Sequence, residues 1–219
     1  MLRVDGLCYS YGRTAVLESL SFSVDAGQCI VLAGPNGCGK STALSLIAGA
    51  LKHKSGTIRH DGRLGYIPQG TALFEDATVA ENLRFFAGLA GCDVPSSLPF
   101  SVEAYQKRRV SDLSGGMKKQ VSIACALVGD PDLILLDEPC AALDITFRDE
   151  MTALVKKWKS AGKTVVYVGH DPAEFREFFD TLLFLGRPPQ SFSRDAAFAD
   201  DPSAFGEFFR TQLNFINRK

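Results

Sequence analysis

The stretch from Gly34 to Thr42 carries residue types that together can hold a chain of phosphates. It fits the spacing G-x-x-x-x-G-K-[ST], in which glycines let backbone N–H groups turn toward an anion. Lys40 adds a positive charge for the β- and γ-phosphates, and Ser41 adds a hydroxyl for Mg²⁺. The pattern predicts a nucleoside triphosphate site built from the whole stretch: Gly34, Pro35, Asn36, Gly37, Cys38, Gly39, Lys40, Ser41 and Thr42.

The residues on either side of this stretch predict the elements that position it. The apolar run Cys29–Ala33 is typical of a buried strand, and the spacing of Leu44, Ile47, Ala48 and Leu51 is typical of a helix face. A helix that begins at the glycine-rich turn directs the positive end of its dipole at the phosphates. In this context a chance match to a glycine-rich turn is the weaker interpretation.

A second possible anion site lies at Leu113–Met117. Ser114 occupies an N-cap position, and Gly115 and Gly116 follow it in the first helical turn. An ordinary N-capped helix would explain Ser114, but each glycine costs about 1 kcal/mol inside a helix. We therefore expect a second helix start that presents backbone N–H groups to an anion.

Three further candidates follow predicted strands. Asp137 and Glu138 end the apolar run Leu133–Leu136, where Asp137 suits a Mg²⁺ site through coordinated water and Glu138 suits a general base. His170 comes soon after the apolar strand Thr164–Val168. Open α/β sheets bind ligands beyond the carboxyl ends of their strands, so this placement favours functional over structural roles.

Gln69 and Tyr11 are candidates for which the residues leave two interpretations open. Gln69 follows a predicted strand at 64–67 and could ligate Mg²⁺ or position water, although a lone glutamine is usually a surface residue. Tyr11 could stack on a base or cap the edge of a sheet, and the residues alone slightly favour the sheet edge.

The composition indicates a chain that can bury a sizeable core. It is 46% hydrophobic, and 24 basic against 25 acidic residues give a formal net charge of -1. Nothing in that balance predicts a nucleic-acid partner. The apolar runs are too short to cross a bilayer, and no signal peptide pattern opens the chain. The six cysteines form no C-x-x-C pair and are expected to be reduced thiols, so we expect a soluble cytosolic protein.

The order of the segments predicts an α/β fold with a P-loop core, whose mixed, mainly parallel sheet is flanked by helices. Alternating strand patterns near the N-terminus and a hairpin-like stretch at 55–63 predict an antiparallel β edge. A small helical subdomain is inserted at about 76–129, opening with the capping box Thr78-x-x-Glu81 and containing a short basic helix at 102–109.

The predicted nucleotide-binding domain covers residues 1–185, and residues 186–219 differ in composition. They combine Pro188 and Pro189 with scattered phenylalanines, and they predict a linker and then a Phe-rich helix from about Pro202. This tail either packs on the core or offers an interaction surface, and the residues do not decide between the two.

Together these motifs resemble the nucleotide-binding subunit of ATP-binding cassette (ABC) transporters over nearly all of residues 2–185. The L-S-G-G signature followed by Walker B is highly specific to that family. Six motifs occur in family order, and a seventh, the D-loop, matches Ala142-Leu143-Asp144. The six are the aromatic Tyr11, Walker A at Gly34–Thr42, the Q-loop Gln69, the signature Leu113–Met117, Walker B at Leu133–Glu138 and the switch His170.

The resemblance implies ATP and Mg²⁺ as cofactors and assigns roles to the residues. Tyr11 would stack on adenine, and Ser114, Gly115 and Gly116 would reach the γ-phosphate of ATP held by another subunit. The implied nucleotide site also includes Asp144. The implied Mg²⁺ ligands are Ser41, Gln69 and Asp137, and the implied catalytic residues are Glu138, His170, Gln69 and Lys40.

Met117 stands where most members carry Gln, as it does in multidrug, antibiotic and lipid exporters, while Cys140 and Ile145 replace the usual Thr and Pro. The resemblance therefore implies an ATP-hydrolysing subunit of an exporter. It would dimerise around two ATP molecules and power a separate integral membrane permease at the inner face of the cell membrane. The alternative is a soluble mechanical or regulatory ABC-type ATPase.

Overall fold

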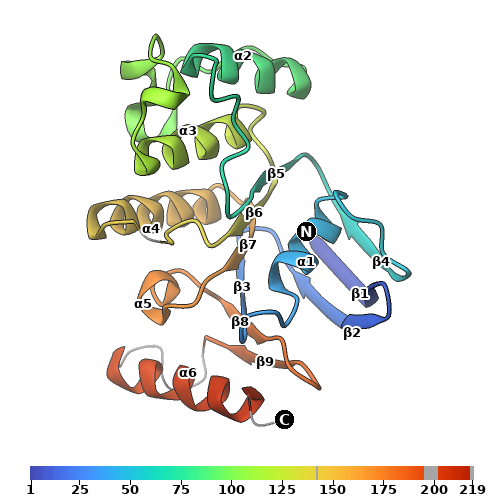
Figure 1. Ribbon diagram of the computed structural model, residues 1–219. Coiled ribbons are helices and arrows are strands. Elements are labelled where there is room, and N and C mark those ends of the chain that lie inside the picture. Colours follow the sequence, from blue (N-terminus) through green and yellow to red (C-terminus); the bar gives the residue numbers. More distant parts are fainter. Residues whose placement is uncertain (142, 195–201, 218–219) are drawn as a thin grey trace.

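The computed structural model describes residues 1–141, 143–194 and 202–217, which form two sheets and a helical lobe (Figure 1). The larger sheet has six strands in the order β5-β6-β7-β3-β8-β9. Its neighbours are parallel except that β9 is antiparallel to β8, which confirms the predicted mixed, mainly parallel P-loop core. The strands are β3 Cys29–Ala33, β5 Leu64–Ile67, β6 Leu133–Asp137, β7 Thr164–Val168, β8 Thr181–Phe184 and β9 Gln190–Ser193.

The central strands β3, β6 and β7 are buried at every residue, as expected for parallel strands that are covered on both faces. Alternate residues supply two cores. One core packs against helices α4 (Ile145–Ser160) and α5 (Pro172–Phe175). The other packs against α1 (Lys40–Ile47) and the smaller sheet. The larger sheet is therefore a rigid platform between two layers.

The smaller sheet is antiparallel, with the order β2-β1-β4, and it confirms the predicted β edge. Its strands are β1 Leu2–Tyr11, β2 Thr14–Val24 and β4 Ser55–His60. The hairpin expected at 55–63 is wrong, because β4 pairs with β1 while β5 joins the larger sheet beside β6. The Asp61-Gly62 turn, with Gly62 at φ 75°, connects the two sheets, and the Asp132 carboxylate accepts a hydrogen bond from the N–H of Arg63 beyond it.

The helical lobe contains α2 (Val79–Ala90), the 3₁₀ helices η1 (Pro99–Tyr105) and η2 (Val110–Asp112), and α3 (Gly115–Leu127) around its own apolar core. The predicted capping box is present: Thr78 Oγ1 accepts from the Glu81 N–H, and Glu81 Oε2 accepts from the Thr78 N–H at 2.7 Å.

The single helix expected at 102–109 is wrong. That segment lies within η1 and the turn that joins it to η2, and Phe100 and Ser101 have positive φ angles of 61° and 49°. Wholly buried Val102 and Val110 pack in the core of the lobe, so tertiary packing overrides the amphipathic pattern.

The segment after Leu185 contributes to the larger sheet and its core. The predicted linker contains β9, and helix α6 spans Pro202–Asn217. Phe205 and Phe209 on α6 are buried against Phe175 and Phe184, with ring centroids 5.3–6.1 Å apart. The sequence left open whether this tail packs on the core or offers an interaction surface. Phe205 and Phe209 pack on the core. Among the described residues, no helix is long and apolar enough to span a membrane.

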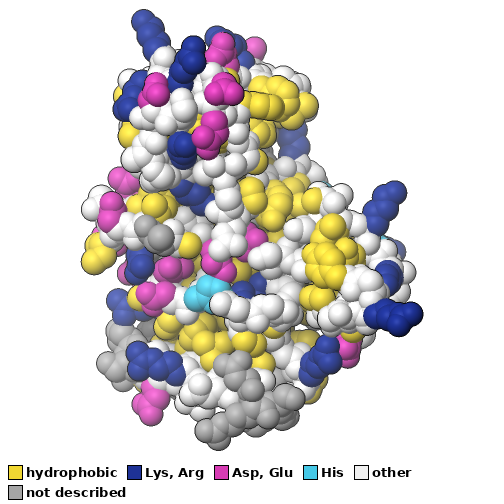
Figure 2. All heavy atoms as spheres, in the orientation of Figure 1, with side chains coloured by type: hydrophobic (Ala, Val, Ile, Leu, Met, Phe, Trp, Pro, Cys, Tyr) yellow, Lys and Arg dark blue, Asp and Glu magenta, His cyan; other side chains and the backbone are white. Residues whose placement is uncertain are grey.

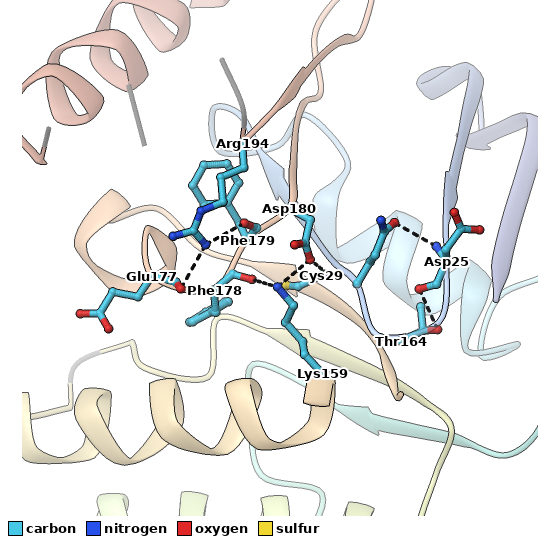
Figure 3. A network of polar contacts seen from close by, with 10 residues as sticks. Asp25, Cys29, Lys159, Thr164, Glu177, Phe178, Phe179, Asp180 and Arg194 are labelled. Atoms are coloured by element: carbon cyan, nitrogen blue, oxygen red, sulfur yellow. Dashed lines mark hydrogen bonds and ion pairs between the residues drawn. The ribbon is translucent and has the colours of Figure 1, made fainter. Parts of the chain in front are cut away.

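A polar cluster at the start of the strands fastens several elements together (Figure 3). Asp180 Oδ2 accepts the N–H of Cys29 at 2.7 Å and lies 2.7 Å from the ammonium of Lys159 at the end of α4. Lys159 also donates to the carbonyl of Phe178 at 2.6 Å, and Arg194 donates to the carbonyl of Phe179 at 3.2 Å. The cluster lies at the opposite edge of the sheet from the strand ends where ligands are expected.

The cluster predicts a stability difference between two carboxylates. Asp180→Ala removes a partly buried acceptor and leaves the Cys29 N–H and the Lys159 ammonium with one partner fewer, so it should lower the free energy of unfolding by about 2–4 kcal/mol. Glu177→Ala breaks an exposed pair with Lys156 and should cost less than about 1 kcal/mol. Urea unfolding of both variants measures this difference, and equal losses would contradict it.

Candidate functional site

A cavity of about 580 Å³ lies at the carboxyl ends of the parallel strands. Four adjacent strands contribute to it: β3 leads into the glycine-rich loop, β5 into Gln69, β6 into Glu138, and β7 into His170. The β1–β2 edge adds Tyr11 and Val16. The cavity thus brings together most of the predicted site, being lined by Tyr11, Val16, Asn36, Gly37, Gly39, Lys40, Ser41, Thr42, Gln69, Glu138 and His170.

The glycines of the loop are required where they stand. Gly39 has φ 104°, and a Cβ there would lie 2.8 Å from Leu17 Cδ2 and 2.9 Å from Val16 Cγ1. Gly34 has φ 146°, and a Cβ there would lie 2.7 Å from Cys38 Sγ. Gly39 is also the N-cap of α1 and offers no capping side chain, so the first N–H groups of the helix are available to an anion.

Lys40 and Ser41 open α1 at the cavity. The Lys40 ammonium donates to the carbonyls of Gly34 and Pro35 at 2.9 and 3.0 Å, which holds the loop around the lysine. The Ser41 hydroxyl donates to Asp137 Oδ1 at 3.1 Å. Two of the residues predicted to serve Mg²⁺ are therefore in direct contact.

This oxygen set fits Mg²⁺. Mg²⁺ prefers hard oxygen ligands and is usually held by one or two carboxylates together with substrate phosphates. The structure offers the Ser41 hydroxyl and the Asp137 carboxylate side by side, and Gln69 lines the same cavity. Burial raises the pKa of Asp137, and the hydrogen bond from Ser41 opposes that rise. A nearby cation would also lower this pKa, because it stabilises the ionised carboxylate. Among the described residues, no group of three or more His, Cys, Asp or Glu side chains could by itself hold a metal ion.

Glu138 is held between two partners from neighbouring strand ends. Its Oε1 lies 2.5 Å from His170 Nε2, and its Oε2 accepts from Gln69 Nε2 at 3.2 Å. Its N–H donates to the Val168 carbonyl at 3.0 Å, and its φ of 48° is uncommon for a residue with a side chain. The carboxylate is thus fixed at the cavity wall by both its backbone and its partners.

The residue after His170 anchors the switch loop. Asp171 caps α5 by accepting the Ala173 N–H at 2.9 Å, and its second oxygen accepts from Arg148 Nη1 of α4 at 3.2 Å. The His170 side chain itself is 41% exposed, so it remains accessible from the cavity.

Tyr11 lies at the end of β1 and is 53% exposed. It contacts Tyr9 edge-on, with centroids 4.9 Å apart, and it also lines the cavity. The position is compatible with both interpretations of this ring, because the residue ends a strand and yet stands beside the glycine-rich loop.

Among the described residues, those of the signature (Leu113–Met117) and Leu143 and Asp144 of the D-loop do not line this cavity. Ser114 caps α3, its hydroxyl accepting from the Met117 N–H at 3.3 Å, and a Cβ on Gly115 would meet no atom within 4 Å. Asp144 caps α4 by accepting from the Phe147 N–H at 2.9 Å, and Ala142 lies outside the described residues. Within one chain, then, the second helix start is open and separate from the phosphate loop.

Two residues that line or support the site were not identified from the sequence. Val16 lines the cavity from β2, and no local pattern marks it. Lys119 on α3 is only 6% exposed and donates to the carbonyls of Pro68 and Gln69. Its signal was its place among buried residues of that helix, since Ser122 and Ile123, three and four positions on, share its face.

Comparisons with known proteins agree with this fold and site. The family model for ABC transporters matches residues 17–141. The taurine import ATP-binding protein TauB of Escherichia coli O157:H7 is 37% identical over 205 residues, covering 86% of this chain and 80% of that protein. A solved structure of an ATP-binding subunit of an ABC transporter superposes with a TM-score of 0.86 at 26% identity, covering 98% of this chain and 99% of the other.

The chain belongs to the ABC transporter family, which confirms the resemblance drawn from its motifs. It is an ATPase, with ATP and Mg²⁺ as its cofactors, as the motifs predicted. The exporter prediction based on Met117 is wrong, because the similar TauB proteins are import ATP-binding proteins. One signature residue does not report the direction of transport.

The exposed ring of Tyr11 yields a binding prediction. If it stacks on adenine, Tyr11→Ala should lose roughly 1–3 kcal/mol of ATP binding, whereas Tyr11→Phe keeps the ring and should bind like the parent. Titration calorimetry with a non-hydrolysable ATP analogue measures both. Parent-like binding by the two variants would leave Tyr11 as a sheet-edge residue and make Tyr9 the next candidate.

Proposed function

We propose that this chain is the ATP-hydrolysing subunit of an ABC importer and that it acts at the cytoplasmic face of the membrane. The observation that carries the proposal is the Glu138 carboxylate, which is held by Gln69 and His170 across the cavity from Lys40 and Ser41. A positioned base opposite a phosphate loop is the arrangement that hydrolysis of a phosphoanhydride needs.

In the proposed reaction, Glu138 accepts a proton from water as the water oxygen attacks the γ-phosphorus, and the bond to the β–γ bridging oxygen breaks to release ADP. A carboxylate has about four lone-pair sites, so Glu138 can bind the water while it keeps Gln69 and His170. Lys40 stabilises charge on the transferring group, and His170 contacts the γ-phosphate. Ser41, Gln69 and Asp137 are the residues that would hold Mg²⁺, which when bound would supply positive charge to offset the charge of the phosphates.

The separation of Ser114 from the phosphate loop supports a pair of subunits. The chain has one Walker A loop, and the start of α3 with Gly115 and Gly116 does not face the cavity of its own subunit. A two-fold arrangement would place Ser114 of each copy at the γ-phosphate bound by the other, so that every contact is made twice. Asp144, at the start of α4, would then approach the nucleotide from the interface.

The membrane partner and the direction are supported by two observations. Hydrophobic side chains gather on the surface over α2 (Figure 2), where Phe74, Phe85 and Leu89 are 53%, 46% and 71% exposed. An exposed apolar patch of this kind is typical of a protein contact, which a separate permease would supply. The import names of the TauB relatives favour an importer, and we expect the permease to select the substrate.

The role of Glu138 is tested by a substitution that keeps the shape of the side chain. Glu138→Gln should retain ATP binding and slow hydrolysis by about 10²–10⁴-fold, because it removes the positioned base. Lys40→Ala serves as the contrast and should weaken ATP binding itself. Phosphate release and nucleotide binding measure the two effects, and near-parent turnover by Glu138→Gln would overturn the proposal.

A further inference from the structure

Lys119 is a buried cation whose partners lie far away in the sequence. It is on α3, five residues after Ser114, and only 6% of it is exposed. Its ammonium donates to the carbonyl of Pro68 at 2.7 Å and to that of Gln69 at 3.1 Å. No carboxylate lies within ion-pair distance of it in the part of the chain that the structure describes. The Lys119 ammonium therefore donates its hydrogen bonds to the two residues that directly follow β5.

Burying this charge is costly, and an apolar side chain would suit the position. Burial lowers the pKa of Lys119 to about 8, against the opposing effect of Asp137, Cys140 and Glu138. The neighbours Val121 and Ile123 are wholly buried apolar residues. The two carbonyls that Lys119 holds are its direct hydrogen-bond partners, and the negative charge of Asp137 and Glu138 offsets a further part of the cost.

The two carbonyls belong to Pro68 and Gln69, whose backbone places the Gln69 side chain at the site. Gln69 is fixed at both ends: its carbonyl accepts from Lys119, and its side-chain amide donates to Glu138 at 3.2 Å. Ser114 is the N-cap of α3, the helix that carries Lys119. About 1.5 Å of rise per residue puts the two roughly 7.5 Å apart along a rigid helix.

We infer that Lys119 is a positioning residue that fixes the Gln69 amide against Glu138 and links the signature helix mechanically to the hydrolysis site. The inference rests on the function proposed for Gln69 and Glu138. When α3 moves toward the phosphates of a partner subunit, Lys119 carries the Pro68–Gln69 backbone with it. A shift of α3 that brings Ser114 to those phosphates would therefore also move Gln69 relative to Glu138.

The test replaces Lys119 by methionine, which keeps a similar length and loses every donor. ATP turnover by the purified chain should fall by about tenfold to a hundredfold, the scale of a small misplacement in an active site, while KM for ATP changes less than about twofold. Lys119→Arg keeps the charge and the donors and should recover most of the rate. Lys118→Met is the matched control, because the Lys118 ammonium binds only Glu75 at the surface among the contacts described, and it should leave turnover unchanged.

A double-mutant cycle with Gln69→Ala separates positioning from general structure. If Lys119 acts through Gln69, Lys119→Met should have no further effect on turnover in the Gln69→Ala background. Hydrogen–deuterium exchange of the backbone amides of residues 69–73 should also become faster in Lys119→Met and not in Lys118→Met. Effects on turnover that add, or exchange that does not change, would overturn the inference.

The failures of the two proposals can be told apart. If Gln69→Ala slows turnover and Lys119→Met does not, only the role of Lys119 is overturned. If Gln69→Ala by itself leaves turnover unchanged, the role proposed for Gln69 fails and the positioning role of Lys119 fails with it.

Discussion

The site depends on one constraint, the parallel alignment of the neighbouring strands β5, β6, β7 and β3. Because all four run in the same direction, the residues that follow them meet at one edge of the sheet. Gln69, Glu138 and His170 come from three adjacent strand ends, and the glycine-rich loop comes from the fourth. The buried central strands supply the rigidity, so the contacts of 2.5 and 3.2 Å around Glu138 follow from the register of the sheet.

The site also depends on the position of helix α3 in the helical lobe. Ser114 begins α3 in open space, away from the phosphate loop of its own chain, and Lys119 on the same helix holds the backbone of Gln69. Helix α3 and the contact between Lys119 and Gln69 therefore connect the signature to the residues around Glu138. A subunit arranged in this way would complete its chemistry only when another copy engages Ser114.

Sequence reasoning succeeded where the signal is local or strongly patterned. The apolar run before Asp137 became β6, and Thr78 with Glu81 forms the capping box. It failed where partners lie far away in the chain. The Asp61-Gly62 turn could not show that β4 would pair with β1, and nothing near Lys119 identified carbonyls about fifty residues earlier as its partners. The prediction of the direction of transport was also wrong, because Met117 alone does not encode that direction.

In the proposed dimer each hydrolysis site is shared between two copies, and mixing two inactive variants tests this sharing most directly. Lys40→Ala damages the phosphate loop, and Ser114→Arg crowds the γ-phosphate bound by the partner. Single-turnover ATP hydrolysis should be lost in each variant alone and restored in an equimolar mixture, because a mixed dimer contains one site with native Lys40 and native Ser114. A mixture no more active than its components, or normal hydrolysis by Ser114→Arg alone, would contradict the account.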